Sequence, residues 1–383
     1  MGGFHLQKGG PLRVLVVDDT VVYRKAVSDV LSEIPDVEVV GTASNGKIAM
    51  SKIDSLKPDL LTLDIEMPEM NGIDVLASLQ EQSRDVGVIV LSTLTRKGGD
   101  LTMQALELGA FDFITKPEAD SMEESRQQIK NAIGPMLKAF ARRQEIKSIL
   151  KGSSSTTSVF QPQPPTRKSK GHDDVVQRMK RLAENIRARP EIVGIGISTG
   201  GPKALAQMMP QLPGDINVPI LIVQHMPAIF TQSLAKNLDS KCGFDVKEAV
   251  DGEVVKPNKA YIAPGGKQMK VVAGADGKSR IIRITDDPPE NSCKPSVDYL
   301  FRSISQHYVG RSAGVIMTGM GSDGSLGLKL MKRTGSFIIA QNEETCVVYG
   351  MPKEPIEKGI VDVIAPLDKI AEVIMNAVKG IYH

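Results

Sequence analysis

Short runs of apolar and β-branched residues alternate with helical periodicity over the first third of the chain. The runs are RVLVV, VEVVGTA, DLLTLD, GVIVLS and FDFIT, and helix-forming stretches separate them. Continuous apolar strands separated by helices are typical of a parallel sheet that is covered on both faces. The pattern therefore predicts an α/β fold that begins with a flavodoxin-like unit of five parallel strands over residues 12–135.

The alternation stops between Lys151 and Asp174, where Ser, Thr, Pro and Lys replace the apolar residues. A segment without a hydrophobic period cannot bury a core, so this stretch indicates a linker. Apolar residues at helical spacing come before it, from Glu124 to Leu150, and again after it. We therefore expect a helical and Ser/Pro-rich linker over residues 136–189.

The same alternation resumes after the linker. Its apolar runs are EIVGIGIS, PILIVQHM, KAYIAPG, SAGVIMTG, SFIIAQ and VDVIAP. They predict a second doubly wound α/β domain, with a mostly parallel sheet, over residues 190–380. The segment MKVVAGADGKSRIIRI has the pattern of an inserted β-hairpin that turns around Ala275-Asp276-Gly277.

Composition and charge narrow the class of protein. The charges nearly balance at a net +2, which does not favour a general polyanion binder, so nucleic acid is not an expected partner. Cys242, Cys293 and Cys346 lie far apart without CxxC spacing and indicate reduced thiols. The sequence shows no secretory signal and no run of 18 apolar residues. We therefore expect a cytoplasmic protein without direct membrane insertion.

Acidic side chains follow two strands of the first predicted sheet. Asp18-Asp19 end the first strand and Asp64 ends the third. The carboxyl ends of parallel strands meet at one edge, so we expect these carboxylates to converge there and to be neutralised by Mg²⁺. Lys116 and Ser92 end two further strands and would bring an ammonium and a hydroxyl to the same edge. Such a set is suited to phosphoryl transfer onto Asp64.

The phrases LVVDDT, LTLDIEMPEMNG and GAFDFITKP, in this order, resemble the receiver domain of two-component response regulators. The resemblance implies that Asp64 accepts a phosphoryl group from a histidine kinase. It also implies that Mg²⁺ is held by Asp18, Asp19, Asp64 and the backbone carbonyl of Glu66. The residues that respond to the phosphoryl group would be Ser92, Phe113 and Lys116.

A candidate nucleophile follows the first strand of the second domain. Ser198 lies in GIGISTGGP, where small residues allow a sharp turn from strand to helix. His225 and Asp323 also follow strands, so the imidazole can take the serine proton while the carboxylate orients the imidazole. The backbone amides near Thr199 or Met320 could hold a developing oxyanion.

The phrases ISTGGP, VQHMP, YIAPGG, CKPSVDYLF, IMTGMGSDG and AQNEETCVVYGMP resemble the catalytic domain of chemotaxis protein-glutamate methylesterases. The resemblance implies a triad of Ser198, His225 and Asp323 that needs no cofactor. Its substrates would be glutamate γ-methyl esters on methyl-accepting chemotaxis receptors, and many members also deamidate particular glutamines. The chain order Ser, His, Asp disfavours the α/β-hydrolase family, in which the acid precedes the histidine.

Two other classes of protein remain as alternatives. Gly194-x-Gly196-x-x-x-Gly200 after a strand could cradle a pyrophosphate, but the position for a ribose-binding acid holds Gln224-His225. A phosphorylation-switched scaffold would explain the receiver and the linker, yet it would leave the three candidate catalytic residues idle. Ester hydrolysis by the purified protein separates the enzyme from the scaffold.

A receiver linked to a hydrolase suggests how activity is controlled. Phosphorylation adds about −1.5 to −2 charge, and drawing Ser92 and Phe113 inward would alter the outer face of the receiver. Our hypothesis is that this face covers the Ser198 crevice until Asp64 is modified.

Overall fold

The computed structural model describes residues 10–117, 121–152 and 188–382. Its N-terminal unit, residues 10–152, is built on a five-stranded sheet of order β2-β1-β3-β4-β5 in which all neighbours are parallel. The strands are β1 (Leu12–Val17), β2 (Val37–Ala43), β3 (Leu60–Asp64), β4 (Gly87–Ser92) and β5 (Asp112–Thr115). The predicted five-stranded parallel fold is confirmed.

Five helices cover this sheet. They are α1 (Val21–Ser32), α2 (Gly46–Leu56), α3 (Gly72–Glu81), α4 (Arg96–Glu107) and α5 (Met122–Gly152). Helix α5 continues beyond residue 135, and Leu137 and Phe140 belong to the hydrophobic core of the N-terminal unit. Phe140 meets Phe111 edge to face, with ring centroids 5.4 Å apart. The segment expected as a linker therefore begins as part of a core helix, and its residues 153–187 lie outside the described residues.

The C-terminal unit, residues 188–382, contains a seven-stranded sheet of order β14-β13-β12-β6-β7-β9-β8. Every neighbouring pair is parallel, which confirms the expected doubly wound domain. Its strands are β6 (Ile192–Ile197), β7 (Ile220–Gln224), β8 (Asp245–Glu248), β9 (Lys259–Ile262), β12 (Ser312–Ile316), β13 (Phe337–Gln341) and β14 (Val363–Ala365). The predicted hairpin is present as antiparallel β10 (Gln268–Ala273) and β11 (Arg280–Thr285), and Gly277 adopts a positive φ in its turn.

Both faces of this sheet are buried. Successive side chains of a strand point to opposite faces, and in β7 Ile220 and Ile222 join one hydrophobic cluster while Leu221 and Val223 join another. The helices are α7 (Gly201–Met208), α8 (Ala228–Asp239), α9 (Val297–His307), α10 (Ser325–Arg333), α11 (Lys353–Glu357) and α12 (Leu367–Lys379), with a short 3₁₀ turn, η1, at Met209–Gln211. None of the helices in the described ranges combines the length and the apolar character needed to cross a membrane.

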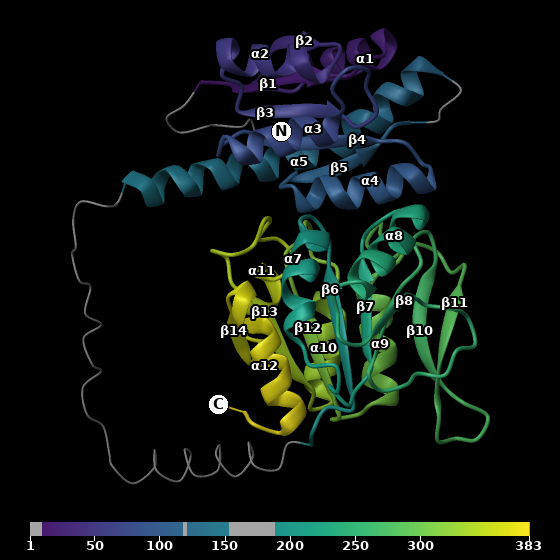
Figure 1. The fold of residues 1–383 in the computed structure, drawn as a ribbon. Helices are drawn as coiled ribbons and strands as arrows, with labels where there is room; N and C mark the ends of the chain where they lie inside the picture. The colour runs from purple at the N-terminus through teal and green to yellow at the C-terminus, as the bar shows by residue number, and fades with distance from the viewer. Residues whose placement is uncertain (1–9, 118–120, 153–187, 383) are drawn as a thin grey trace, which may run out of the picture.

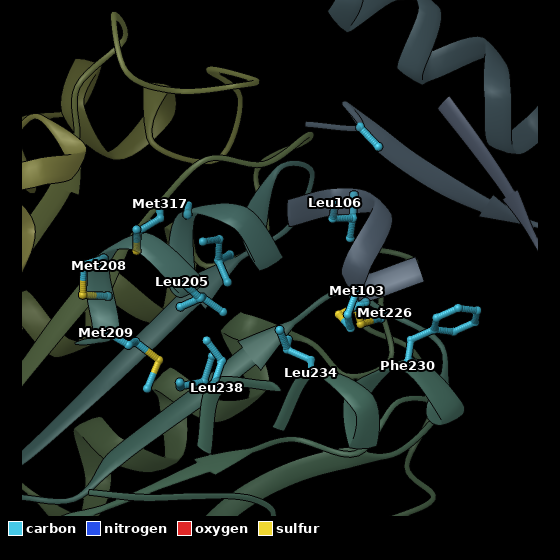
Figure 2. Packing of buried hydrophobic residues seen from close by; sticks show 14 of the residues in the cluster. Met103, Leu106, Leu205, Met208, Met209, Met226, Phe230, Leu234, Leu238 and Met317 are labelled. Atoms are coloured by element: carbon cyan, nitrogen blue, oxygen red, sulfur yellow. The ribbon is translucent and has the colours of Figure 1, made fainter. Parts of the chain in front are cut away.

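The two units pack against each other through α4 and α8, which lie across their boundary (Figure 1). One continuous hydrophobic cluster includes Met103 and Leu106 of α4 together with Leu205, Met226 and Phe230 of the C-terminal unit (Figure 2). The apolar core is therefore shared across the boundary, and the carboxyl edge of the second sheet faces the N-terminal unit.

Candidate active site and acidic site

The structure brings Asp18, Asp19 and Asp64 together at the carboxyl edge of the first sheet, with oxygens within 4.8 Å of one another. Lys116 Nζ lies 2.9 Å from Asp18 Oδ2 and 2.8 Å from Asp64 Oδ2. Burial and the neighbouring carboxylates outweigh the attraction of Lys116 and raise the pKa of Asp64 to about 6. One ammonium faces three carboxylates, so the site carries excess negative charge. Both this charge and the hard oxygen donors fit a divalent cation such as Mg²⁺.

The other residues predicted for this site lie around it. Ser92 is buried, and its hydroxyl accepts a hydrogen bond from Thr102 Oγ1 at 2.7 Å, so here it faces α4 rather than Asp64. Glu66 lies in the loop after β3, where its side chain pairs with Lys97 at 2.5 Å. Phe113 lies at the boundary between the units, and its ring centroid is 4.5 Å from that of Phe230 in α8.

The candidate catalytic residues follow adjacent strands of the second sheet. β6 lies between β7 and β12, so Ser198 after β6 is flanked by His225 after β7 and by the loop after β12 that carries Asp323. His225 Nε2 is 2.8 Å from Asp323 Oδ2, and the carboxylate is almost fully buried. The structure thus places these two side chains in hydrogen-bond contact.

Asp323 is held by many donors besides the imidazole. Its oxygens accept hydrogen bonds from Asn291 Nδ2, Ser296 Oγ and the backbone amides of Val297 and Asp298, at 2.7 to 3.1 Å. Burial opposes the charged form, but the hydrogen bond and charge of His225 and the amides hold the pKa of Asp323 below its usual value. Asp323 is therefore ionised, and His225 Nε2–H donates to it.

The second ring nitrogen of His225, Nδ1, is not engaged by Asp323. Its Nδ1 lies 3.7 Å from Cys293 Sγ, and no hydrogen bond joins Ser198 to His225 among the described residues. Ser198 and His225 nevertheless line the same cavity of about 240 Å³. The cavity therefore brings Ser198 and His225 together, and Asp323 contacts it through its hydrogen bond to His225.

The protonation of His225 follows from its surroundings. Burial disfavours the imidazolium, but the hydrogen bond to Asp323 and the adjacent Cys293 thiol raise the pKa of His225 to about 9. An imidazolium has no lone pair that could accept a proton, so the protonated ring cannot act as a general base.

The turn after β6 presents free backbone donors beside Ser198. Gly200 adopts a positive φ of 75°, and the amide of Gly201 donates to the Ser198 carbonyl at 2.7 Å, which closes the turn. The amides of Thr199 and Met320, our oxyanion candidates, donate no hydrogen bond to any described residue. Both remain available to a developing negative charge.

Sequence reasoning missed several residues around the nucleophile. Gln224 is buried, and its Nε2 donates to the carbonyls of Ser198 at 3.0 Å and His225 at 3.2 Å, which ties the two turns together. The sequence feature that could have indicated Gln224 is its position beside His225 at the end of β7. Asn291 and Cys293 follow no strand and show no hydrophobic period, because a loop of irregular backbone carries them to the site.

The N-terminal unit covers this cleft. Asp112 and Phe113, at the start of β5, line the cavity together with Ser198. The Asp112 carboxyl accepts hydrogen bonds from the Thr199 side chain and the Gly200 amide, although burial outweighs them and raises its pKa to about 7. A carboxyl group of the N-terminal unit thus lies against the turn that follows Ser198.

Two family models match the chain. The model described as the CheB methylesterase matches residues 193–374, and the model described as the response regulator receiver domain matches residues 14–128.

Curated relatives match almost the full length. A protein-glutamate methylesterase/protein-glutamine glutaminase of Desulfotalea psychrophila is 53% identical over 369 residues, covering 96% of this chain and 99% of the relative. One of Bacillus subtilis is 41% identical over 373 residues, with 96% and 99% covered. A crystal structure of the Thermotoga maritima CheB methylesterase catalytic domain is 42% identical, covering 49% of this chain and 98% of that one, with a TM-score of 0.48.

The charge state of His225 can be measured directly by nuclear magnetic resonance of the histidine rings. Because Asp323 and Cys293 stabilise the imidazolium, we expect His225 to lose its proton as the pH rises through about 9. Asp323→Asn should lower this pKa by at least about one unit, since a buried imidazolium then loses its counter-charge. His307, whose pKa is lowered by burial and by Arg280, is the internal control and should be neutral at pH 7. A His225 that titrates together with His307 would contradict the electrostatic account.

Proposed function

The chain belongs to the family of protein-glutamate methylesterases that carry a receiver domain, and we propose that Ser198, His225 and Asp323 carry out its hydrolysis of glutamate γ-methyl esters. The observation that carries the assignment is the hydrogen bond between Asp323 and His225, whose imidazole lines the same cavity as Ser198. An oriented imidazole beside a serine at a strand-to-helix turn is the arrangement that acyl transfer needs.

Each residue has a defined part in the reaction. Ser198 Oγ attacks the ester carbonyl while neutral His225 accepts the serine proton at Nδ1, because Nε2–H is committed to Asp323. The amides of Thr199 and Met320 receive the oxyanion. His225 then returns the proton to the departing methoxide, so methanol is released and an acyl-serine remains. Water activated by the same imidazole hydrolyses this acyl-serine to free glutamate.

The same route accounts for glutamine deamidation. A glutamine side chain offers a carbonyl of similar shape, and attack by Ser198 expels ammonia instead of methanol to give the same acyl-serine. The relatives' names combine the two activities. We assign both reactions to this one cleft, on glutamate and glutamine side chains of chemotaxis receptors, in the service of sensory adaptation.

The acidic site gives the regulatory input. We assign Asp64 as the acceptor of a phosphoryl group from a histidine kinase, with Asp18, Asp19, Asp64 and the Glu66 carbonyl as the groups that would hold Mg²⁺. The bound ion would screen the charge of the carboxylates and of the incoming phosphoryl group. Lys116 already bridges Asp18 and Asp64, so it is placed to contact that group.

The contacts at the boundary support control by covering. Phe113 packs on Phe230, and Asp112 hydrogen-bonds to the turn that follows the nucleophile. Lys116 comes just after the same short strand, β5, that carries these two residues. A shift of Lys116 and Phe113 toward a phosphorylated Asp64 therefore loosens the contact that closes the cleft.

The nucleophile assignment is tested by Ser198→Ala, with methanol release from methylated receptor membranes as the measurement. Loss of the hydroxyl removes the acyl-serine route, so we expect the turnover number to fall by about 10⁴-fold or more while the thermal midpoint stays close to the parent's. Ser51→Ala, at an exposed position of α2, is the matched control and should behave as the parent. Turnover near the parent level in Ser198→Ala would overturn the assignment.

The acceptor is tested by Asp64→Asn, with the methylesterase rate measured with and without a small-molecule phosphodonor and Mg²⁺. An amide cannot accept the phosphoryl group, so we expect the stimulation to disappear while the unstimulated rate stays within about twofold of the parent's. Asp54→Asn, on the exposed surface of the same unit, should be stimulated like the parent. If Asp64→Asn responds as strongly as Asp54→Asn, another residue is the acceptor.

Covering of the cleft is tested by a charge swap across the boundary. Glu107 of α4 pairs with Lys241 and accepts a hydrogen bond from Asn237 at 2.7 Å. Lys241→Glu places two carboxylates together, so we expect the unphosphorylated rate to rise about two- to fivefold, the range set by an exposed ion pair of up to 1 kcal/mol.

The double variant Glu107→Lys/Lys241→Glu restores the attraction and should return the rate to the parent level. A Lys241→Glu variant without a rise, or a rise that the double variant retains, would show that this contact does not restrain the enzyme.

A further inference from the structure

We propose that Cys293 and His225 form a binding site for a borderline-soft divalent cation such as Zn²⁺, and that occupancy of this site switches the esterase off. The three side chains of His225, Cys293 and Asp323 each offer a ligand atom within 4.8 Å of the others. The spacing of cysteines along the sequence gave no such indication, because the imidazole belongs to the loop after β7, 68 residues before the thiol.

The separation of the two donor atoms fits one metal ion. Cys293 Sγ lies 3.7 Å from His225 Nδ1. With metal–nitrogen and metal–sulfur bonds of about 2.0 and 2.3 Å at a tetrahedral angle, two ligands of one Zn²⁺ lie about 3.5 Å apart. The side chains therefore need almost no movement to bind the ion together.

Asp323 prepares the imidazole for this role. It already accepts four hydrogen bonds from the chain besides the one from His225 Nε2–H, so it serves as the outer partner rather than as a ligand. A carboxylate that holds the far nitrogen of a ligating histidine fixes the ring and makes the near nitrogen more basic. The bond to Asp323 thus exposes the Nδ1 lone pair toward Cys293.

The thiol is held in place and can be reached. Glu290 and Cys293 exchange two backbone hydrogen bonds, at 2.8 and 3.1 Å, and Gln268 Nε2 donates to the Cys293 carbonyl at 3.4 Å. Cys293 and His225 are both partly exposed, and His225 lines the cavity of about 240 Å³. Water can therefore supply the remaining ligands of the ion.

The chemistry of the donors separates this site from the acidic site of the N-terminal unit. Asp18, Asp19 and Asp64 offer only oxygen, which suits Mg²⁺, whereas a thiolate and an imidazole select Zn²⁺ and similar ions. Binding releases the thiol proton and, where His225 is an imidazolium, its Nδ1 proton as well. No oxidant or reductant is involved.

Inhibition follows because the metal occupies the lone pair that must accept the serine proton. This consequence rests on the proposed role of His225 as the base, whereas binding of the ion does not. The two parts can therefore be measured separately on the full-length protein.

Binding is measured first, with Co²⁺ as a spectroscopic probe and with Zn²⁺ as its competitor. We expect one equivalent of Co²⁺ to give the near-ultraviolet absorption of a thiolate–Co²⁺ bond, and Zn²⁺ to abolish that absorption. Cys293→Ser should lose it, while Cys346→Ser and Cys242→Ser, which alter the other two cysteines, should retain it. Retention of the absorption in Cys293→Ser would overturn the site.

Inhibition is measured next, as the ratio of methylesterase rates with and without Zn²⁺ for each variant, so that each protein is its own reference. We expect the parent and Cys346→Ser to lose at least tenfold in rate and to recover with a chelator, and Cys293→Ser to lose less than twofold. Equal inhibition of Cys293→Ser and the parent would overturn the switch. Co²⁺ binding at Cys293 without any inhibition would keep the metal site but remove His225 from the role of base.

Discussion

The structure of the cleft depends on one buried carboxylate, Asp323, and on what it does to His225. Five hydrogen bonds converge on this carboxylate, one from the imidazole and four from the chain. Because breaking a buried pair of this kind leaves an uncompensated charge, the position of the imidazole is strongly determined. The same bond engages Nε2, leaves Nδ1 as the second ring nitrogen, and favours the protonated form of the ring.

Strand β5 connects the acidic site to the catalytic cleft over a very short distance. It is only four residues long, with Asp112 and Phe113 at the start against the C-terminal unit and Lys116 just past its end against Asp64. A strand spans about 3.3 Å per residue, so the two ends lie within roughly 15 Å of each other. A paired strand moves as a rigid element, and a phosphoryl signal therefore needs no long chain of side chains to reach the cleft.

The sequence predicts the architecture well because both sheets are buried on both faces and their strands are continuous apolar runs. Strand β8, with the sequence DVKE, was not expected, since an edge strand of polar residues lacks that signal. Ser198, His225 and Asp323 were proposed as site residues because each follows a strand of one parallel sheet, which is also where the structure has them. The sequence did not predict three contacts: the hydrogen bond between Asp323 and His225 Nε2, the approach of Cys293 to His225, and the contact of Asp112 with Thr199. They depend on side-chain rotamers, a loop and packing between units, none of which has a sequence period.

The hydrophobic cluster shared by the two units favours the arrangement in which they are in contact over one in which they are separated. Separation of α4 from α8 would transfer Met103 and Leu106 into water, and each Å² of apolar surface so exposed costs about 25 cal/mol. Reclosure is then spontaneous once the phosphoryl group is lost, and it occurs within one chain, so its rate does not depend on protein concentration. Under the proposed control by covering, the active state would therefore last as long as the phosphoryl group stays on the receiver domain.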